Sequence, residues 1–316
     1  MKKYLQLLCF TALFVMLLPV FANDKREIKI LRQTPSALDR AISDHLCVSY
    51  EVIHPYHRCK EAYFEPGKLT RKERAEYDFI ITSEQFFNEK LKRDFQLVLP
   101  LYHQAFTVVT RGIDEVSLFK PGMKYGVLQQ KAQENVLSEV LKAMSVDERK
   151  LSVEHLESQD LVDRFCSFDL NVAFVIGAHP NKIVRQLNTL CDGEPISIVQ
   201  ELPKNFFQRH RYFYQTHVPK ELYWRLPNDI ETLSVRYLLA VNKSMDEADL
   251  DELMDSFINE LEYNSSLPIT EASILLNYNN LQTPLHEVGD ELMEELQEEQ
   301  ASKQADLEEK QNEGML

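Results

Sequence analysis

The sequence predicts a two-lobed α/β protein in which each lobe is a mostly parallel sheet flanked by helices. Apolar runs alternate with stretches of helical period in the first half of the chain, and the alternation starts again in the second half. The chain, at 316 residues, is long enough for two lobes of ordinary domain size. A late apolar run, Val235–Val241, can return to the first lobe as a strand. These features predict a hinged protein with a ligand cleft between its lobes, because ligands of open α/β sheets bind beyond the carboxyl ends of the strands.

The first half of the chain predicts the order β-α-β-α-β. Its first helix, expected at Ser36–Leu46, has apolar residues at helical spacing, namely Leu38, Ile42 and Leu46. Val48–Ile53 follows with alternating side chains and is expected to be the second strand. The strands expected in this half are 28–31, 48–53, 77–81, 95–101 and 105–110.

A second unit of the same kind follows along the chain. The strands expected here are 123–128, 151–153, 170–176 and 196–199, and the helices are 133–144, 160–165 and 181–190. The helix at 133–144 carries an apolar stripe on one face, which suits packing against a sheet. After the returning strand, three amphipathic stretches are expected to complete the fold.

The N-terminus has the layout of a cleavable secretory signal. Lys2 and Lys3 form a basic region, an uncharged apolar stretch runs from Leu5 to Val20, and small residues end at Ala22. An uncleaved anchor is the alternative, since the apolar stretch lies at the lower edge of the length that crosses a bilayer. We expect cleavage after Ala22, a location outside the cytoplasm, and no membrane insertion of the mature chain.

The net charge of the chain argues against several classes of binding partner. The formal charge of −15 becomes −17 once Lys2 and Lys3 leave with the signal, so binding to nucleic acid or to an anionic membrane surface is not expected. The aromatic-rich run Phe206–Tyr214, which also holds two arginines, is expected to be a lobe-bridging loop packed on the cleft. Ten acidic residues between Asp290 and Glu313 predict a solvated terminal helix, with a docking tail as the alternative.

The predicted organisation therefore has five parts. These are a signal peptide at 1–22, the first part of lobe 1 at 23–112, lobe 2 at 113–218, a return to lobe 1 with C-terminal helices at 219–289, and an acidic helical or disordered tail at 290–316.

The mature chain holds four cysteines, Cys47, Cys59, Cys166 and Cys191. An even number in an exported chain suggests disulfides. Four cysteines allow three pairings, of which we expect sequence neighbours, Cys47 with Cys59 and Cys166 with Cys191. The alternative is a metal site, since three histidines lie near the first pair. The close C-x-x-C spacing that zinc sites favour is missing, so no metal is expected.

Four segments carry motifs shared with one known family. They are Cys166–Asn181 with Cys191 (C-x-x-x-x-D-A…GxHPN…C), Asp229–Val241 (the strand after V-x-T-x-x-V), Thr283–His286 with Gly289 (P-L-H-P-G-A), and Leu101–Tyr102 with Phe106–Arg111 (L-Y…VVVR). In these segments the chain resembles the TAXI family, the periplasmic solute receptors of one class of TRAP transporter. Some members also carry a first disulfide where Cys47 and Cys59 lie. The resemblance implies a type II periplasmic binding protein-like fold, no cofactor, and TRAP membrane subunits as partners.

The chain departs from that family at three glycine-rich turns. TGxxGGTY is replaced here by Gln33–Leu38, TxGSxxN by Cys59–Gly67, and GSGTR by Gln129–Glu134. Such turns let backbone N–H groups approach a bound carboxylate. The scaffold resembles the family, and the ligand chemistry does not.

The candidate ligand contacts are polar residues at strand ends and turns, and two of them, Ser83 and Tyr102, lie where the TAXI family has a serine and a cleft-facing aromatic residue. The candidates are Thr34, Ser36, Ser83, Tyr102, Gln129, His179 and Asn181. For Thr34, Ser36, Ser83 and Asn181 the alternative is a helix cap, and for His179 it is to shape the turn that Asn181 caps. For Tyr102 the alternative is a place in the core.

Two functions follow from these observations. The first is a solute-binding receptor of a TRAP-type system that closes around a small anionic molecule, a carboxylate or an amino acid. The second is a ligand-free scaffold that binds another envelope protein. An enzyme is not expected, because the chain contains no G-x-S-x-G elbow, no H-E-x-x-H and no P-loop.

Overall fold

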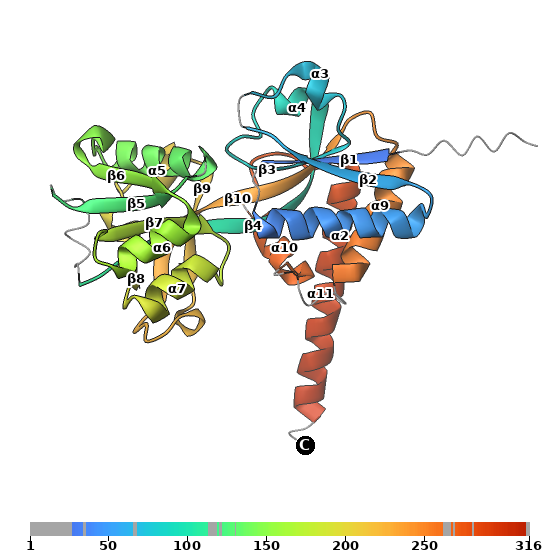
Figure 1. The fold of residues 1–316 in the computed structure, drawn as a ribbon. Helices are drawn as coiled ribbons and strands as arrows, with labels where there is room; N and C mark the ends of the chain where they lie inside the picture. Colours follow the sequence, from blue (N-terminus) through green and yellow to red (C-terminus); the bar gives the residue numbers. More distant parts are fainter. Residues whose placement is uncertain are drawn as a thin grey trace, which may run out of the picture.

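The computed structural model describes residues 27–33, 36–65, 68–112, 119, 122–129, 131–261, 267, 269–279 and 281–313. Ten strands form one sheet that runs through two lobes (Figure 1). The strands are β1 (Glu27–Arg32), β2 (Arg58–Tyr63), β3 (Phe79–Ser83), β4 (Phe95–Thr110), β5 (Lys124–Leu128), β6 (Ser152–Leu156), β7 (Val172–Gly177), β8 (Glu194–Ile196), β9 (Phe213–Val218) and β10 (Ile230–Asn242). The helices are α2 (Ala37–Ile53), α3 (Arg71–Arg74), α4 (Leu91–Asp94), α5 (Lys131–Ala143), α6 (Ser158–Cys166), α7 (Lys182–Leu190), α8 (Phe206–Arg209), α9 (Glu247–Leu261), α10 (Glu271–Tyr278) and α11 (Glu287–Glu313).

Two long strands, β4 and β10, connect the lobes. The main sheet order is β2-β1-β3-β10-β4-β7-β5-β6, with β8 on β4 and β9 on β10. β10 pairs with β9 through residues 230–235 and with β3 through residues 237–241. β4 pairs with β10 along its first part and with β7 along residues 105–110. We call β1–β3 with their helices lobe 1, β5–β9 with theirs lobe 2, and β4 and β10 the hinge strands.

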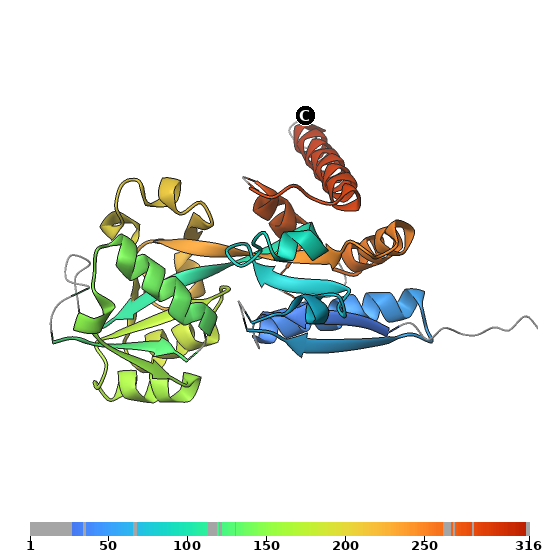
Figure 2. The same cartoon turned by 90° about the horizontal axis from the view of Figure 1, so that it is seen from above.

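Each lobe holds three strands that pair in parallel and a hinge strand that pairs with them in antiparallel fashion. In lobe 1, β1 lies between β2 and β3, and β3 meets β10. In lobe 2, β5 lies between β6 and β7, and β7 meets β4. Figures 1 and 2 show helices on the outer faces of these sheets. The predicted two-lobed α/β fold, with a mostly parallel sheet flanked by helices in each lobe, is confirmed.

The strand expected at Val48–Ile53 is wrong, because these residues complete helix α2. The helix buries Ile42, Leu46 and Tyr50, whose spacing of four residues places them on one face. Val48 and Val52 are 51% and 63% exposed on the opposite face. The alternation of Val48, Tyr50 and Val52, which resembles that of a strand, therefore arises from two valines on the exposed face of a helix. The second strand of the chain is β2, which follows this helix.

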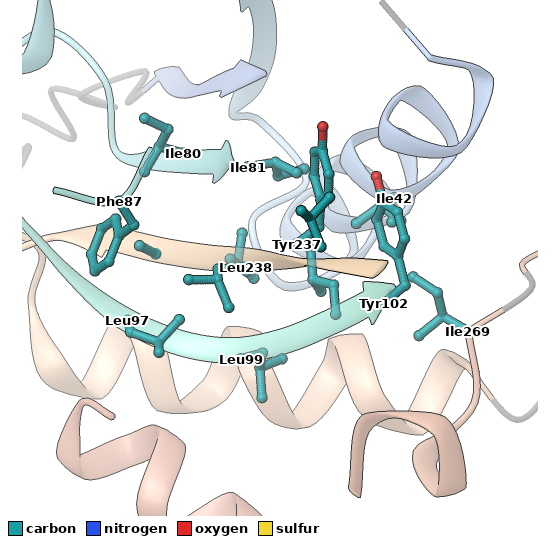
Figure 3. Packing of buried hydrophobic residues seen from close by; sticks show 14 of the residues in the cluster. Ile42, Ile80, Ile81, Phe87, Leu97, Leu99, Tyr102, Tyr237, Leu238 and Ile269 are labelled. Atoms are coloured by element: carbon teal, nitrogen blue, oxygen red, sulfur yellow. The ribbon is translucent and has the colours of Figure 1, made fainter. Parts of the chain in front are cut away.

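The core of lobe 1 packs around β3, β10 and β4. Figure 3 shows Ile42 of α2 beside Tyr102 and Tyr237, and it shows Leu97 and Leu99 on β4 in the same cluster. α9 packs on α2, while α10 and α11 pack on β4. These contacts bring the end of the chain back to lobe 1.

Helix α11 begins in the core and then leaves it. Its first turns bury Val288, Leu292 and Leu296, and the rest projects from the body (Figures 1 and 2). Gly289 lies in the first turn of α11, where the helix packs on β4. An added Cβ there would lie 2.4 Å from the backbone oxygen of Val98. Only a glycine allows so close an approach. In the described part of the chain, no helix has both the length and the apolar content to span a bilayer.

Both predicted disulfides are confirmed. Cys47–Cys59 ties α2 to β2, and Cys166–Cys191 ties the end of α6 to the end of α7. Over the described ranges, no three His, Cys, Asp or Glu side chains are grouped so that they could hold a metal ion.

Candidate functional site

A small cavity lies where the two lobes and the hinge strands meet. Its volume is about 10 Å³, which is roughly the space of one water molecule. The cavity is lined by Gln33, Ser83, Gln85 and Phe86 from lobe 1, Gln104, Val235 and Tyr237 from the hinge strands, and Val136 and Ile176 from lobe 2. Since both lobes supply its walls, separating them would open it.

The polar corner of the cavity is built at the carboxyl ends of two neighbouring parallel strands. Gln33 follows β1 and Ser83 ends β3. The Gln33 side-chain oxygen accepts hydrogen bonds from the Thr82 hydroxyl at 2.6 Å and from the Ser83 backbone N–H at 2.7 Å. The amide group is therefore held in one orientation, with its NH₂ group fixed relative to the cavity.

The remaining polar atoms of this corner lack partners. Gln33 and Ser83 are only 6% and 2% exposed, and within the described part of the chain neither the Gln33 Nε2 nor the Ser83 Oγ makes a hydrogen bond. An unpaired buried polar group costs about 1–3 kcal/mol. Two adjacent ones beside a cavity are typical of a site that receives a hydrogen-bonding group from outside the chain.

The rest of the described lining is uncharged; it combines the polar side chains of Gln85, Gln104 and Tyr237 with apolar ones. Val235 and Tyr237 alternate with Arg236 along β10, so the guanidinium of Arg236 lies on the other face of the sheet. There it stacks on the Tyr214 ring at 4.1 Å and lies 3.6 Å from a Glu84 carboxylate oxygen.

Tyr102, a predicted contact, holds the core together next to the cavity. Its hydroxyl donates to the Asp39 carboxylate on α2, and its ring stacks on Tyr237 with centroids 5.0 Å apart (Figure 3). Burial first, and then the Asp39 charge, raise the pKa of Tyr102 well above its usual value. The hydroxyl stays protonated and joins β4 to α2.

Replacing Tyr102 by phenylalanine is expected to lower the free energy of unfolding by about 2 kcal/mol, because a hydrogen bond to a buried carboxylate is lost. Urea unfolding measures the effect. The matched control is Tyr56→Phe at a 70% exposed tyrosine, which should change stability by less than about 0.5 kcal/mol. Equal stability of Y102F and Y56F would show that the bond to Asp39 contributes nothing.

His179 and Asn181 form a hydrogen-bonded turn inside lobe 2. The Nε2 of His179 lies 2.8 Å from the Thr107 hydroxyl, and its Nδ1 lies 2.5 Å from the Tyr223 hydroxyl. Burial lowers the pKa of His179 to about 4, so the ring is neutral at neutral pH. Asn181 caps α7, its side-chain oxygen accepting from the backbone N–H groups of Ile183 and Val184. His179 is engaged by Thr107 and Tyr223, Asn181 caps its own helix, and neither lines the cavity.

The other predicted contacts lie in separate places. Ser36 caps α2 and accepts from the Asp39 N–H, and Gln129 is exposed after β5. Thr34 lies outside the described residues. Of the predicted set, the structure brings only Ser83 to the cavity among the described residues.

Gln33 is the neighbour that sequence reasoning missed. Its position in the sequence could have revealed it, because Gln33 directly follows strand β1 just as Ser83 ends strand β3. Gln104 had no such signal, because it lies inside a long strand whose facing is set by the sheet.

The solved structures that match this chain share little sequence with it. A periplasmic transporter is 13% identical over 90% of this chain and 97% of its own, with a TM-score of 0.45. The periplasmic aliphatic sulphonate binding protein of Escherichia coli is 11% identical over 85% of this chain and 78% of its own, with a TM-score of 0.43. The regulatory domain of a LysR family regulator from N. meningitidis is 9% identical over 77% of this chain and 96% of its own, with a TM-score of 0.43. Comparison with curated protein sequences finds no match.

A comparison with protein families matches residues 79–291, about two thirds of the chain. The matched segment contains both hinge strands, all of lobe 2 and the Ser83 side of the cavity. The chain belongs to the NMT1-like family.

Proposed function

We propose that the protein is an exported receptor that closes its two lobes around a small solute. The observation that carries the proposal is the cavity at the meeting of both lobes, where the Gln33 Nε2 and the Ser83 hydroxyl are buried without partners among the described residues. The two disulfides suit an oxidising compartment such as the periplasm. The N-terminal layout supports export, with cleavage after Ala22.

The corner offers hydrogen-bond donors to a solute. The Nε2 of Gln33 can only donate, and the Ser83 hydroxyl can donate or accept. An acceptor oxygen of a carboxylate or a carbonyl group satisfies both. Phe86, Val136 and Ile176 would enclose the rest of the molecule once the lobes close about the hinge strands. The favoured solute is a small carboxylate or amino acid.

We propose that the receptor delivers its solute to a TRAP-type transport system. The TAXI resemblance of the Cys166–Cys191 segment and of the Thr283–Gly289 segment supports this assignment. Its membrane subunits would then be the partners of the closed receptor.

A second candidate is a scaffold that binds an envelope protein and no solute. It is favoured by the volume of the cavity, about 10 Å³, which holds roughly one water molecule in this closed arrangement. It is also favoured by the replacement of the three glycine-rich turns.

A thermal-shift screen with dicarboxylates and amino acids tests the receptor. A binding solute at one hundred times its Kd should stabilise the wild-type chain by about 2.7 kcal/mol. Gln33→Glu keeps the oxygen that accepts from Thr82 and replaces the donor NH₂ by a negative oxygen, so the shift should disappear. Ser83→Ala should reduce it, since a single hydroxyl is removed.

Gln129→Glu is the matched control, because it makes the same change at an exposed residue outside the cavity. Its shift should equal that of the wild type. If no solute stabilises the wild-type chain and an envelope protein copurifies with it, the receptor proposal fails and the scaffold takes its place.

A further inference from the structure

The turn after β3 reaches from lobe 1 into lobe 2 through two consecutive side chains. Gln85 donates from its Nε2 to the Oε1 of Glu139 at 2.8 Å, and Glu139 belongs to α5 of lobe 2. The other oxygen of Glu139 accepts from the Tyr212 hydroxyl. Because Gln85 also lines the cavity, this bridge closes the lobes beside it.

The preceding residue, Glu84, makes the second connection. Its Oε2 accepts from the Tyr214 hydroxyl at 2.6 Å, and Tyr214 lies on β9 of lobe 2. The same oxygen lies 3.6 Å from Nη1 of Arg236, whose side chain faces away from the cavity. The side chains of Glu84 and Arg236 are 6% and 1% exposed, so this contact is almost dry.

Both tyrosines are fixed as donors. Burial first, and then the hydrogen bond to Glu139, raise the pKa of Tyr212; burial and the bond to Glu84 raise the pKa of Tyr214. Hydrogen bonds to a carboxylate are roughly twice as strong as those between neutral groups. The Gln85–Glu139 and Glu84–Tyr214 contacts join the two lobes, so they depend on how the lobes are placed. The bond from Tyr212 lies within lobe 2 and holds the Glu139 carboxylate in position.

We propose that Glu84, Gln85, Glu139, Tyr212 and Tyr214 form an interlobe latch that holds the protein closed when no solute is bound. The Gln85–Glu139 bridge must break when the lobes separate beside the cavity. The Glu84 contacts lie next to the hinge strand β10 and act as the pivot. The latch belongs to the chain alone and does not depend on the proposed solute.

The latch has a consequence for any ligand of the cleft. If entry requires the open state, the apparent affinity falls in proportion to the fraction of molecules that are open. Residues that never touch the ligand, such as Glu139 and Tyr212, would then set how readily the receptor is loaded.

Distance measurements between nitroxide labels test the latch without any solute. Labels at Glu51→Cys on α2 and Gln159→Cys on α6 report on the two lobes, since both residues are exposed and on helices of different lobes. The four cysteines at 47, 59, 166 and 191 are paired, so the labels react at the new positions. The parent protein should give mainly the short, closed distance.

Glu139→Ala should raise the ratio of open to closed molecules by roughly 10-fold to 100-fold, because it removes the charged acceptor of the Gln85 bridge between the lobes. Glu139→Gln, which keeps an acceptor oxygen without the charge, should give a smaller increase. Ser138→Ala, at the exposed neighbouring position on the same helix, should leave the distance distribution unchanged.

The same distribution in the parent and in E139A, or a parent that is already mainly open, would overturn the latch. Circular dichroism establishes that each variant is folded before the distances are measured. If E139A does not fold, the comparison is made between the parent and E139Q. Since no solute enters this experiment, a failed solute screen leaves the latch standing, and an absent latch leaves the receptor proposal standing.

Discussion

Lowering the pH from 7.5 to 5 is expected to cost about 4 kcal/mol of unfolding free energy through two buried histidines. His103 lies 2.7 Å from the Ser234 hydroxyl, and burial together with the Arg236 charge lowers its pKa to about 3. Burial lowers the pKa of His179 to about 4. In the unfolded chain both rings titrate near 6.5.

The sign follows from which state binds the protons. Between pH 6.5 and the lowered pKa values of about 3 and 4, the unfolded chain holds protons on His103 and His179 that the folded chain refuses. The stability is therefore complete above pH 6.5 and is lost as the pH falls. At pH 5, which is 1.5 units below 6.5, each histidine costs about 2 kcal/mol at 1.36 kcal/mol per unit.

Urea unfolding at pH 7.5, 6 and 5 measures this loss. His103→Gln and His179→Gln should each make the pH dependence shallower by about 2 kcal/mol over that range. The matched control is His217→Gln, whose side chain is 59% exposed, and it should leave the slope as in the wild type. If a double variant of His103 and His179 loses as much stability as the wild type between pH 7.5 and pH 5, these two histidines are not the cause of the loss.

Removing both disulfides is expected to cost about 6 kcal/mol, about 3 kcal/mol each. The bonds close loops of 12 and 25 residues, so each restricts the unfolded chain by a comparable amount. The total stability of a domain is about 5–15 kcal/mol, so a chain without either bond would lie close to its unfolding transition.

Replacing each pair by alanines and following urea unfolding separates the two contributions. The control is a reducing agent, which should destabilise the wild-type chain and leave the variant without the four cysteines unchanged. Unaltered stability of the alanine variants would show that the unfolded chain gains no freedom when the bonds are removed.

Much of the fold could be predicted because lobe 2 consists of short apolar runs bounded by turn residues. The strand expected at Leu170–Ile176 is observed as β7 at Val172–Gly177, and the helix expected at Asn181–Leu190 is α7 with Asn181 as its cap. The strand expected at Val235–Val241 is the central part of β10. In these segments, periodicity, propensity and end signals agree.

The long hinge strand β4 could not be predicted as one element. Two strands were expected, at 95–101 and 105–110, because polar residues interrupt the apolar run. The structure runs β4 without a break from Phe95 to Thr110, and its register against β10 shifts beside Pro100. A proline removes one ladder donor, and the irregularity in pairing accommodates it. Local sequence does not reveal that both ends of such a strand will find partners.

The candidate site was harder to predict than the fold for a related reason. Ser83 is found because a residue at the end of a parallel strand faces the cleft. Whether a polar side chain there stays free depends on its neighbours, and Asn181 and Tyr102 are engaged by groups that only the folded chain brings near. The free NH₂ of Gln33 likewise results from how Thr82 and Ser83 occupy its oxygen.

The pairing of β3 with β10 limits the order in which the two lobes can fold. Tyr237 lies opposite Ser83 and follows it by 154 positions in the sequence, so this whole stretch must emerge before the two residues can pair. Until then the apolar β3 has no neighbour on its β10 side, whereas β5, β6 and β7 of lobe 2 lie close together in sequence and can assemble first. Distant pairings form slowly and leave strand edges exposed to aggregation. A chain released or cut before residue 230 would therefore present an unfinished lobe 1 to chaperones and proteases, however well lobe 2 had folded.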